Sequence, residues 1–308
     1  MSAATAVLPG TGAAGYLPEI RSPIRRLGRR RIDFDREVAV MAIVNRTPDS
    51  FSDRGRTFSL DAAVAAALAA VEAGADWVDV GGQPFATGTR LTPEQETDRV
   101  LPVVREIRRR SDVIISVDTF EPEVAARCLA EGADVINDTT GFRNPELAAV
   151  VAGAGASVII THSLAAPRAP YPAPRYGDVV GEVASFLARQ ADRAMAAGIA
   201  EDRILLDPGH DLNKNTVHSL ELTRRFAEIA ALGFPTVAAV SNKDFIGETL
   251  DRPVSDRLAG SLAAAVLCIL GGARVVRMHD VPAATAAVRL TEAVLGFRAP
   301  LVQRHNMA

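Results

Sequence analysis

The chain has 308 residues, 48% of them hydrophobic, and a formal net charge of −3 at pH 7, so it can bury a large core. Domains that bind nucleic acid are usually basic, so the slight excess of acidic residues argues against such a partner. Two cysteines, Cys128 and Cys268, cannot build a disulfide framework, and no apolar run is long enough to span a bilayer.

The first 36 residues show little regular pattern. An Ala- and Gly-rich start is followed by the basic run RSPIRRLGRRR at residues 21–31. A signal peptide has its charged residues first, so this order predicts a cytoplasmic protein with reduced cysteines. A basic run can bind an anionic surface, but we favour a basic, partly flexible N-terminal arm or a solvated turn over residues 1–36.

From residue 37 onward the sequence becomes rhythmic. Ala-rich stretches with apolar residues at helical spacing, such as residues 59–76 and 121–134, alternate with short apolar, β-branched segments. These segments lie at 38–45, 77–82, 113–119, 135–140, 157–163, 204–209, 235–243 and 274–280. Apolar strands that alternate with helices predict a parallel sheet covered by helices. Eight such units in about 260 residues favour one α/β domain, a closed (β/α)8 TIM barrel over 37–297, followed by a tail over 298–308.

Polar side chains recur where the predicted strands end. They are Asn45, Asp79, Asp118, Asn137 with Asp138, His162, Asp207, Ser241 with Lys243, and Arg277 with His279. One polar strand end is often just the start of a turn or a helix cap. A barrel, however, gathers all of its strand ends around one mouth, where such enzymes keep their active sites. The recurrence therefore predicts a polar site at that mouth.

Several motifs occur in order at these strand ends. The longest is NRTPDSFSDRG at residues 45–55, and the others are SVDT, VINDTTG, LLDPG followed by Lys214, SNK followed by IG, and RMHDV. Together they make the chain resemble the dihydropteroate synthase family of pterin-binding barrels from about Val38 to Val294. The resemblance implies that dihydropterin pyrophosphate and para-aminobenzoate are joined with loss of pyrophosphate and help from Mg²⁺. It also implies a homodimer formed through helices near the end of the barrel.

The resemblance also implies roles for individual residues. Asp118, Asn137, Asp207 and Lys243 correspond to the groups that bind the pterin ring. Carboxylate, amide and ammonium groups suit an aminopyrimidine edge, on which donors and acceptors alternate. Each of the four could instead cap a helix or lie in solvent, but the ordered motifs favour the binding role.

Three further residues correspond to groups at the leaving pyrophosphate. Arg277 and His279 form an R-x-H pattern on one strand and can hold the pyrophosphate. Asn45 is placed to meet Mg²⁺ or a pyrophosphate oxygen, since Mg²⁺ prefers oxygen ligands. His162 and His210 receive no role, and no spacing typical of a zinc site occurs near them.

The second loop departs from the family pattern. The family motif GGESTRPG is replaced by GGQPFATG, so Phe85 stands in place of Thr and Ala86 in place of Arg. Arginine presents a planar, always charged fork that suits a phosphate or a carboxylate. Its loss predicts weaker contacts to the pyrophosphate and to the aromatic acid.

Two other motifs also differ from the family. DPGFGFGK becomes DPGHDLNK, so Leu212 replaces an aromatic residue beside the aminobenzoate pocket, and S-R-K loses its cation at Asn242. The first loop has gained Arg46 and Arg54. Either could replace the missing guanidinium, although we favour a position in solvent for both.

These departures favour a dihydropteroate synthase-like protein with little or no synthase activity, which still binds pterin or sulfa- and sulfone-type ligands weakly. The alternatives are an active synthase of folate biosynthesis, a pterin-dependent methyltransferase-like barrel acting with a separate corrinoid partner, and a non-catalytic binding protein. Membranes and nucleic acids are not expected as partners.

Overall fold

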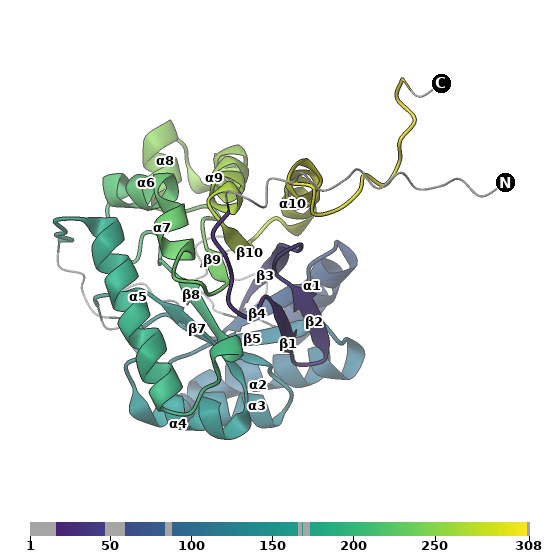
Figure 1. The fold of residues 1–308 in the computed structure, drawn as a ribbon. Coiled ribbons are helices and arrows are strands. Elements are labelled where there is room, and N and C mark those ends of the chain that lie inside the picture. Colours follow the sequence, from purple (N-terminus) through teal and green to yellow (C-terminus); the bar gives the residue numbers. More distant parts are fainter. Residues whose placement is uncertain (1–16, 47–58, 84–87, 166–167, 169–172, 307–308) are drawn as a thin grey trace.

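The computed structural model describes residues 17–46, 59–83, 88–165, 168 and 173–306. A closed barrel of eight parallel strands forms its centre, in the order β10-β3-β4-β5-β6-β7-β8-β9 (Figure 1). Its strands are β3 (Ala39–Asn45), β4 (Trp77–Gly81), β5 (Ile114–Asp118), β6 (Val135–Asp138), β7 (Ser157–Thr161), β8 (Ile204–Asp207), β9 (Thr236–Ala238) and β10 (Ala273–Met278). The prediction of a (β/α)8 barrel is therefore confirmed.

Helices surround the barrel and connect its strands (Figure 1). They are α1 (Leu60–Glu72), α2 (Pro93–Arg110), α3 (Pro122–Ala130), α4 (Pro145–Ala154), α5 (Val179–Ala196), α6 (Thr216–Arg224), α7 (Phe226–Ala230), α8 (Asp244–Leu250), α9 (Leu258–Leu270) and α10 (Val281–Val294). Two short 3-10 helices, η2 (Glu201–Arg203) and η3 (Val254–Asp256), lie in the connections. Within the described ranges, no helix is long and apolar enough to cross a membrane.

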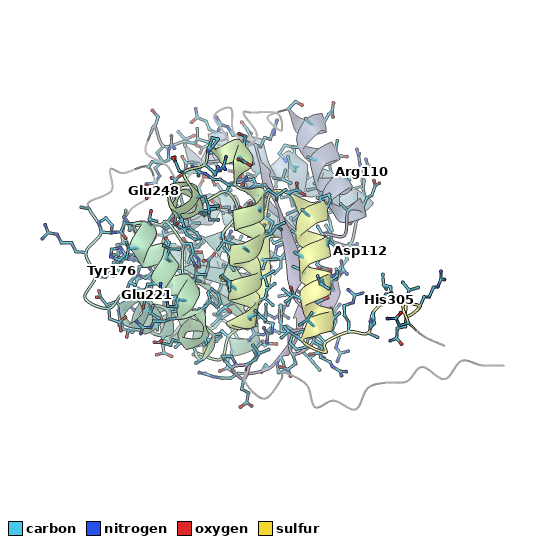
Figure 2. The ribbon with its side chains drawn as sticks, turned by 90° about the horizontal axis from the view of Figure 1, so that it is seen from above. Arg110, Asp112, Tyr176, Glu221, Glu248 and His305 are labelled. Carbon is cyan, nitrogen blue, oxygen red and sulfur yellow. The ribbon has the colours of Figure 1, made fainter. Side chains whose placement is uncertain are left out.

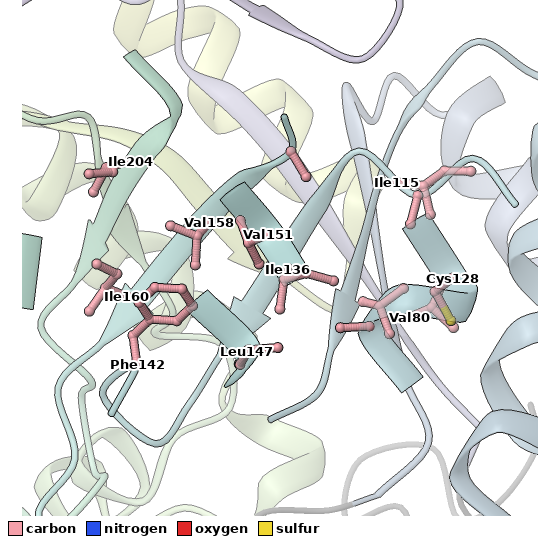
Figure 3. Close-up of a cluster of buried hydrophobic side chains, with 14 of the residues drawn as sticks. Val80, Ile115, Cys128, Ile136, Phe142, Leu147, Val151, Val158, Ile160 and Ile204 are labelled. Atoms are coloured by element: carbon pink, nitrogen blue, oxygen red, sulfur yellow. The ribbon is translucent and has the colours of Figure 1, made fainter. Parts of the chain in front are cut away.

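Strand alternation divides the core into two layers. The outer faces of β4 to β8 pack against the helices, and Figure 3 shows Ile136, Val158 and Ile160 facing Leu147 and Val151 of α4. Cys128 of α3 lies in the same layer, and both cysteines are buried and free, as predicted. The alternate residues of each strand point into the barrel, where they form a second layer.

A hairpin that the sequence did not predict closes the lower end of the barrel. β1 (Ile24–Leu27) and β2 (Arg30–Asp33) pair antiparallel, and Figure 1 shows them at the end of the barrel. Leu27 and Ile32 are buried in the inner layer together with Trp77 of β4. The expectation of a flexible arm or solvated turn is thus wrong for this segment, because its apolar residues fill the barrel floor.

Two buried arginines fasten this hairpin to the barrel. Arg25 is fully buried and its Nη1 donates to the carbonyl oxygen of Ile204 at 2.6 Å. Arg274 of β10 donates through Nε to the carbonyl oxygen of Phe34 at 2.7 Å. Burial lowers the pKa of each guanidinium to about 10, so both remain charged at neutral pH. The basic run at residues 21–31 therefore contributes a structural cation as well as surface charge.

Candidate functional site at the barrel mouth

Strand register brings the predicted ring-binding residues to the same end of the barrel. Asp118 of β5 is paired with Gly81 on one side and with Asn137 of β6 on the other. Asp207 ends β8 and is paired with Thr161 of β7. Asn137 and Asp207 are each only 4% exposed. Because the strands are parallel, these polar groups meet at the mouth, where a ligand can bind.

Asp79 of β4 binds both Asn137 and Arg277. Its side chain is fully buried, and its Oδ2 accepts from Arg277 Nε at 2.7 Å and from Asn137 Nδ2 at 3.1 Å. Its Oδ1 accepts from the Ser116 hydroxyl, which in turn accepts from Trp77 Nε1 at 2.8 Å. A buried carboxylate requires such compensation, since an unpaired charge in the interior is very costly.

This network fixes which atom Asn137 presents to the mouth. Since Nδ2 donates to Asp79, Oδ1 points away from it, and Oδ1 is buried with no hydrogen-bond partner in the described part of the chain. The sequence left open whether this amide would donate or accept. In the structure, the oxygen is the atom of this amide that has no partner, so it is an acceptor that is not yet used.

Arg277 lies between two carboxylates. Besides Asp79, it contacts Asp118 through Nη2 at 3.3 Å. Burial, followed by the charge of Asp79, raises the pKa of Asp118 well above its usual range, although Arg277 opposes this shift. A ligand N–H group at Asp118 would stabilise the charged form of this carboxyl group.

Asp207 is surrounded by cations and backbone donors. Its Oδ1 accepts from the Gly209 N–H at 2.7 Å, and Lys243, Arg277 and Lys214 all lie within electrostatic range. Burial nevertheless raises its pKa. Lys243 is the half-buried N-cap residue of α8, and its charge lowers the pKa of Asp207. The four predicted ring-binding residues are therefore close to one another, and their roles remain predictions.

The residues predicted at the pyrophosphate end lie on β10 and β3. His279 follows β10, and its Nδ1 lies 2.9 Å from the Ser241 hydroxyl. Asn45 ends β3 beside Gly81, and a Cβ built on Gly81 would come within 3.1 Å of the Asn45 Oδ1. The described residues contain no group of three or more His, Cys, Asp or Glu side chains able to hold a metal. A single amide oxygen fits Mg²⁺ only if water and substrate oxygens complete the coordination.

Arg46 does not point to solvent, so that prediction is wrong. Its Nη1 donates to the carbonyl oxygens of Asp98 and Arg99 in α2, at 2.9 and 2.7 Å. Pro102 lies inside α2 and has no N–H, so the Asp98 carbonyl lacks its usual helical donor. Arg46 supplies a donor instead. To replace the missing guanidinium of the second loop, it would have to leave these carbonyls.

The loop after β8 is held by its own side chains. Asp211 and Asn213 replace the two glycines of the family motif, and both have positive φ, which Asp and Asn tolerate better than other residues. Asp211 accepts from the Ser219 hydroxyl at 2.8 Å, and Asn213 Oδ1 accepts from Leu164 and Ala165 N–H at 3.0 and 2.7 Å. These contacts attach the loop to α6 and to the segment after β7.

Lys214 fastens the same loop from inside. Its Nζ lies 2.9 Å from His162 Nδ1 and donates to the carbonyl oxygens of Gly209 and Leu212. Burial lowers the pKa of Lys214 to about 7, and burial followed by Lys214 lowers the pKa of His162 to about 2. His162 is therefore neutral and accepts from Lys214. Half-buried Leu212 lies in this loop.

The remaining residues that the sequence singled out are Asn242, His210, Phe85, Ala86 and Arg54. Asn242 has a φ of 56°, and its N–H donates to the Ser261 hydroxyl at 2.9 Å. His210 lies between Phe226 and Phe245 in the core and acts as a structural residue. Phe85, Ala86 and Arg54 lie outside the described residues.

The sequence reasoning missed two acidic residues. The sequence placed Asp79 at a strand end but did not show that it is the centre of the hydrogen-bond network at the mouth. Glu96 of α2 is 1% exposed and lies beside the Thr119 side chain, which lowers its pKa less than burial raises it. Its spacing from Val100 and Val103 places it on the buried stripe of the helix, a signal that could have revealed it. Burial raises its pKa to about 7.

Comparisons with known proteins agree with this geometry. The model of the pterin binding enzyme family matches residues 41–279. An "Inactive dihydropteroate synthase 2" of Mycobacterium leprae (strain TN) is 42% identical over 277 residues, which cover 88% of this chain and 95% of that protein. The "Dihydropteroate synthase" of Escherichia coli (strain K12) is 41% identical over 260 residues, covering 84% of this chain and 92% of that protein.

Solved structures give the same result. The dihydropteroate synthase of Xanthomonas albilineans with 4-aminobenzoic acid has a TM-score of 0.82 and 39% identity, and the match covers 89% of this chain and 98% of that one. That of Yersinia pestis with a sulfonamide drug complex has a TM-score of 0.84 and 34% identity, with 88% and 98% covered. The protein therefore belongs to the dihydropteroate synthase family of pterin-binding enzymes.

Proposed function

We propose that this protein is a dihydropteroate synthase-like barrel that binds pterins and has little or no synthase activity. The observation that carries the proposal is the second loop, where Phe85 and Ala86 replace the Thr-Arg pair of the family pattern. Ala86 has no polar atom with which to hold a phosphate or a carboxylate. The residues that correspond to ring-binding groups are all retained, namely Asp118, Asn137, Asp207 and Lys243.

Overall similarity does not separate an active from an inactive protein here. A relative named inactive is 42% identical to this chain and one named as a synthase is 41% identical. The distinction therefore depends on individual residues. Losing one preorganised donor to a developing charge costs about 3 kcal/mol, or about a hundredfold in rate. The replacements at Leu212 and Asn242 lower the rate further, but the combined loss of rate is not the product of the single losses.

The first prediction concerns turnover. With dihydropterin pyrophosphate, para-aminobenzoate and Mg²⁺, the purified protein should release pyrophosphate at least about a hundredfold more slowly than an ordinary synthase assayed beside it. The double variant F85T/A86R should raise turnover or substrate affinity, because it restores the fork. F85T/A86K is the matched control and should gain less, since lysine adds charge without the fork. Turnover of the unmodified protein within about tenfold of the control would contradict the proposal.

The three alternative functions predict different experimental results. An active synthase that uses Arg46 or Arg54 should lose readily measured turnover when these residues are changed to alanine. A methyltransferase-like barrel should transfer a methyl group to a separate corrinoid protein. A non-catalytic binding protein shares the lack of turnover with our proposal and differs in having a cellular partner. The contacts of Arg46 with α2 favour none of the catalytic alternatives.

The remaining parts of the proposal concern Mg²⁺ and the cellular setting. Asn45 would contribute one oxygen to Mg²⁺ bound with pyrophosphate, and the metal would neutralise charge on the leaving group. We place the protein in the cytoplasm, beside folate synthesis. The buried, unpaired cysteines are compatible with a reducing compartment.

The second prediction concerns a homodimer formed through α9 and α10. The two helices pack side by side, in yellow-green and yellow in Figure 2. They expose Leu267 and Leu290, and Val294 is 74% exposed, so the helix pair offers an apolar surface of the kind that forms interfaces. Sedimentation should give a dimer, and L290E/V294E should give a monomer. V217E adds charge at a 71% exposed position on α6 and should leave the dimer intact.

A further inference from the structure

Two hydroxyl groups of β7 are buried without hydrogen-bond partners in the described part of the chain. They belong to Ser157 and Thr161, at the two ends of the strand, and the residues are 0% and 2% exposed. A buried hydroxyl left unpaired lowers the stability of the folded protein. Valine has almost the same shape as threonine and would avoid that cost at Thr161, so the hydroxyl there calls for an explanation.

The strand register places Thr161 inside the mouth. Ile159 belongs to the inner layer of the barrel, and side chains two residues apart on a strand share a face, so Thr161 also faces inward. It is level with Asp207 of β8, and β7 lies between β8 and the β6 strand that carries Asn137. Ser157 shares the inward face but lies at the closed end, level with Val135.

The methyl group of Thr161 is directed toward the loop after β8. A Cβ built on Gly209 would lie 3.2 Å from Thr161 Cγ2, so the methyl packs against the backbone there. The hydroxyl therefore has a different direction from the methyl and is not used by that loop. Oγ1 is therefore a buried acceptor without a partner in the described part of the chain, on the strand face that lines the mouth.

The neighbours of Thr161 define what it can meet. Asn137 presents Oδ1, and Asp207 presents carboxylate oxygens, so the strands on both sides of β7 offer acceptors. A fused pyrimidine that carries an amino group beside a ring N–H has three N–H donors along one edge. Asn137 Oδ1 and the Asp207 oxygen that does not bind Gly209 can pair with two of these donors, whereas Asp118 lies one strand further away, on β5. An acceptor on β7 would pair with the third donor, and a buried unpaired N–H is costly.

We propose that Thr161 is a specificity-determining residue of the ring pocket, whose hydroxyl accepts a hydrogen bond from the amino group of a 2-amino-substituted fused pyrimidine. The inference rests on the proposed function, because it requires that the mouth binds such a ring. Asn137, Thr161 and Asp207 then supply one acceptor from each of three successive strands. The pocket thereby selects rings with the amino group over rings without it.

The third prediction tests this selectivity by calorimetric titration with two probes, 6-hydroxymethylpterin and its analogue without the 2-amino group. Thr161→Val should weaken binding of the aminated probe about tenfold and that of the other probe less than about twofold. Thr161→Ser keeps the hydroxyl and should retain most of the affinity and selectivity. Ser157→Ala is the matched control, since it removes the unpaired hydroxyl at the closed end of the same strand, and it should change neither affinity.

The possible outcomes separate the two proposals. If the unmodified protein binds neither probe, the proposed function is overturned and this inference with it. If the unmodified protein binds the aminated probe and Thr161→Val binds it equally well, the inference alone is overturned. Equal weakening of both probes by Thr161→Val also overturns it, because that result indicates a packing defect without a specific contact to the amino group.

Discussion

Replacing Asp79 with asparagine is expected to destabilise the protein by about 3 kcal/mol, because breaking a buried ion pair leaves a charge without its partner. Asp79 is fully buried and pairs with Arg277 at 2.7 Å. An amide oxygen at the Oδ2 position could still accept from Arg277, but it carries no charge, so Asp118 at 3.3 Å would be the remaining charged partner of Arg277. Urea unfolding at pH 7 would measure the change in the free energy of unfolding.

An exposed ion pair provides the control for this measurement. Asp256 contacts Arg252 at 3.2 Å, and both side chains are more than half exposed. Asp256→Asn should change the free energy of unfolding by less than about 1 kcal/mol, as is usual for surface pairs. Equal stability of the Asp79→Asn variant and the unmodified protein would show that the network at the mouth does not depend on this charge.

The same variant should also weaken ring binding. Asp79 holds Asn137 Nδ2, and this contact keeps the Asn137 oxygen directed at the mouth. Without the carboxylate, the amide can turn and present a donor where the ligand also has a donor. Ligand titration would therefore report the loss of amide orientation separately from the loss of stability.

Replacing Glu96 with glutamine is expected to stabilise the protein at pH 8 and to have a much smaller effect at pH 5. Burial raises the pKa of Glu96 from an ordinary 4.5 to about 7. Between these two values the unfolded chain has released the proton while the folded protein still holds it. The free energy of unfolding therefore falls as the pH rises from 4.5 to 7, by about 3 kcal/mol in total, and then levels off.

Glutamine does not titrate, so Glu96→Gln should remove this part of the pH dependence. The measurement is urea unfolding of both proteins at pH 5 and pH 8, and the gain in stability should be larger at pH 8. Glu94 lies in the exposed first turn of the same helix, and its pKa is lowered. Glu94→Gln should therefore give no gain at pH 8. Identical pH profiles for Glu96→Gln and the unmodified protein would show that the pKa of Glu96 is not raised in the folded protein.

The sequence by itself determined the barrel and the location of its site. Eight apolar segments that alternate with helices can bury both of their faces only in a parallel sheet that is covered by helices. When such a sheet closes into a barrel, the carboxyl ends of all its strands lie at one mouth. Asp118, Asn137 and Asp207 could therefore be placed together from their positions alone. The altered second loop was also visible in the sequence, as the loss of a charged fork at Ala86.

Only the tertiary structure decided how these groups are oriented and paired. Arg46 binds α2 because Pro102, 56 positions later in the chain, leaves a carbonyl without its helical donor. Asn137 presents its oxygen because Asp79, on the other side of β5, takes its amide nitrogen. The basic run covers the barrel floor because Leu27, together with Ile32 just after the run, joins the inner core layer, while the buried Arg25 binds the carbonyl oxygen of Ile204. Such partners are distant in sequence, and local pattern carries no information about which buried donor and acceptor will meet.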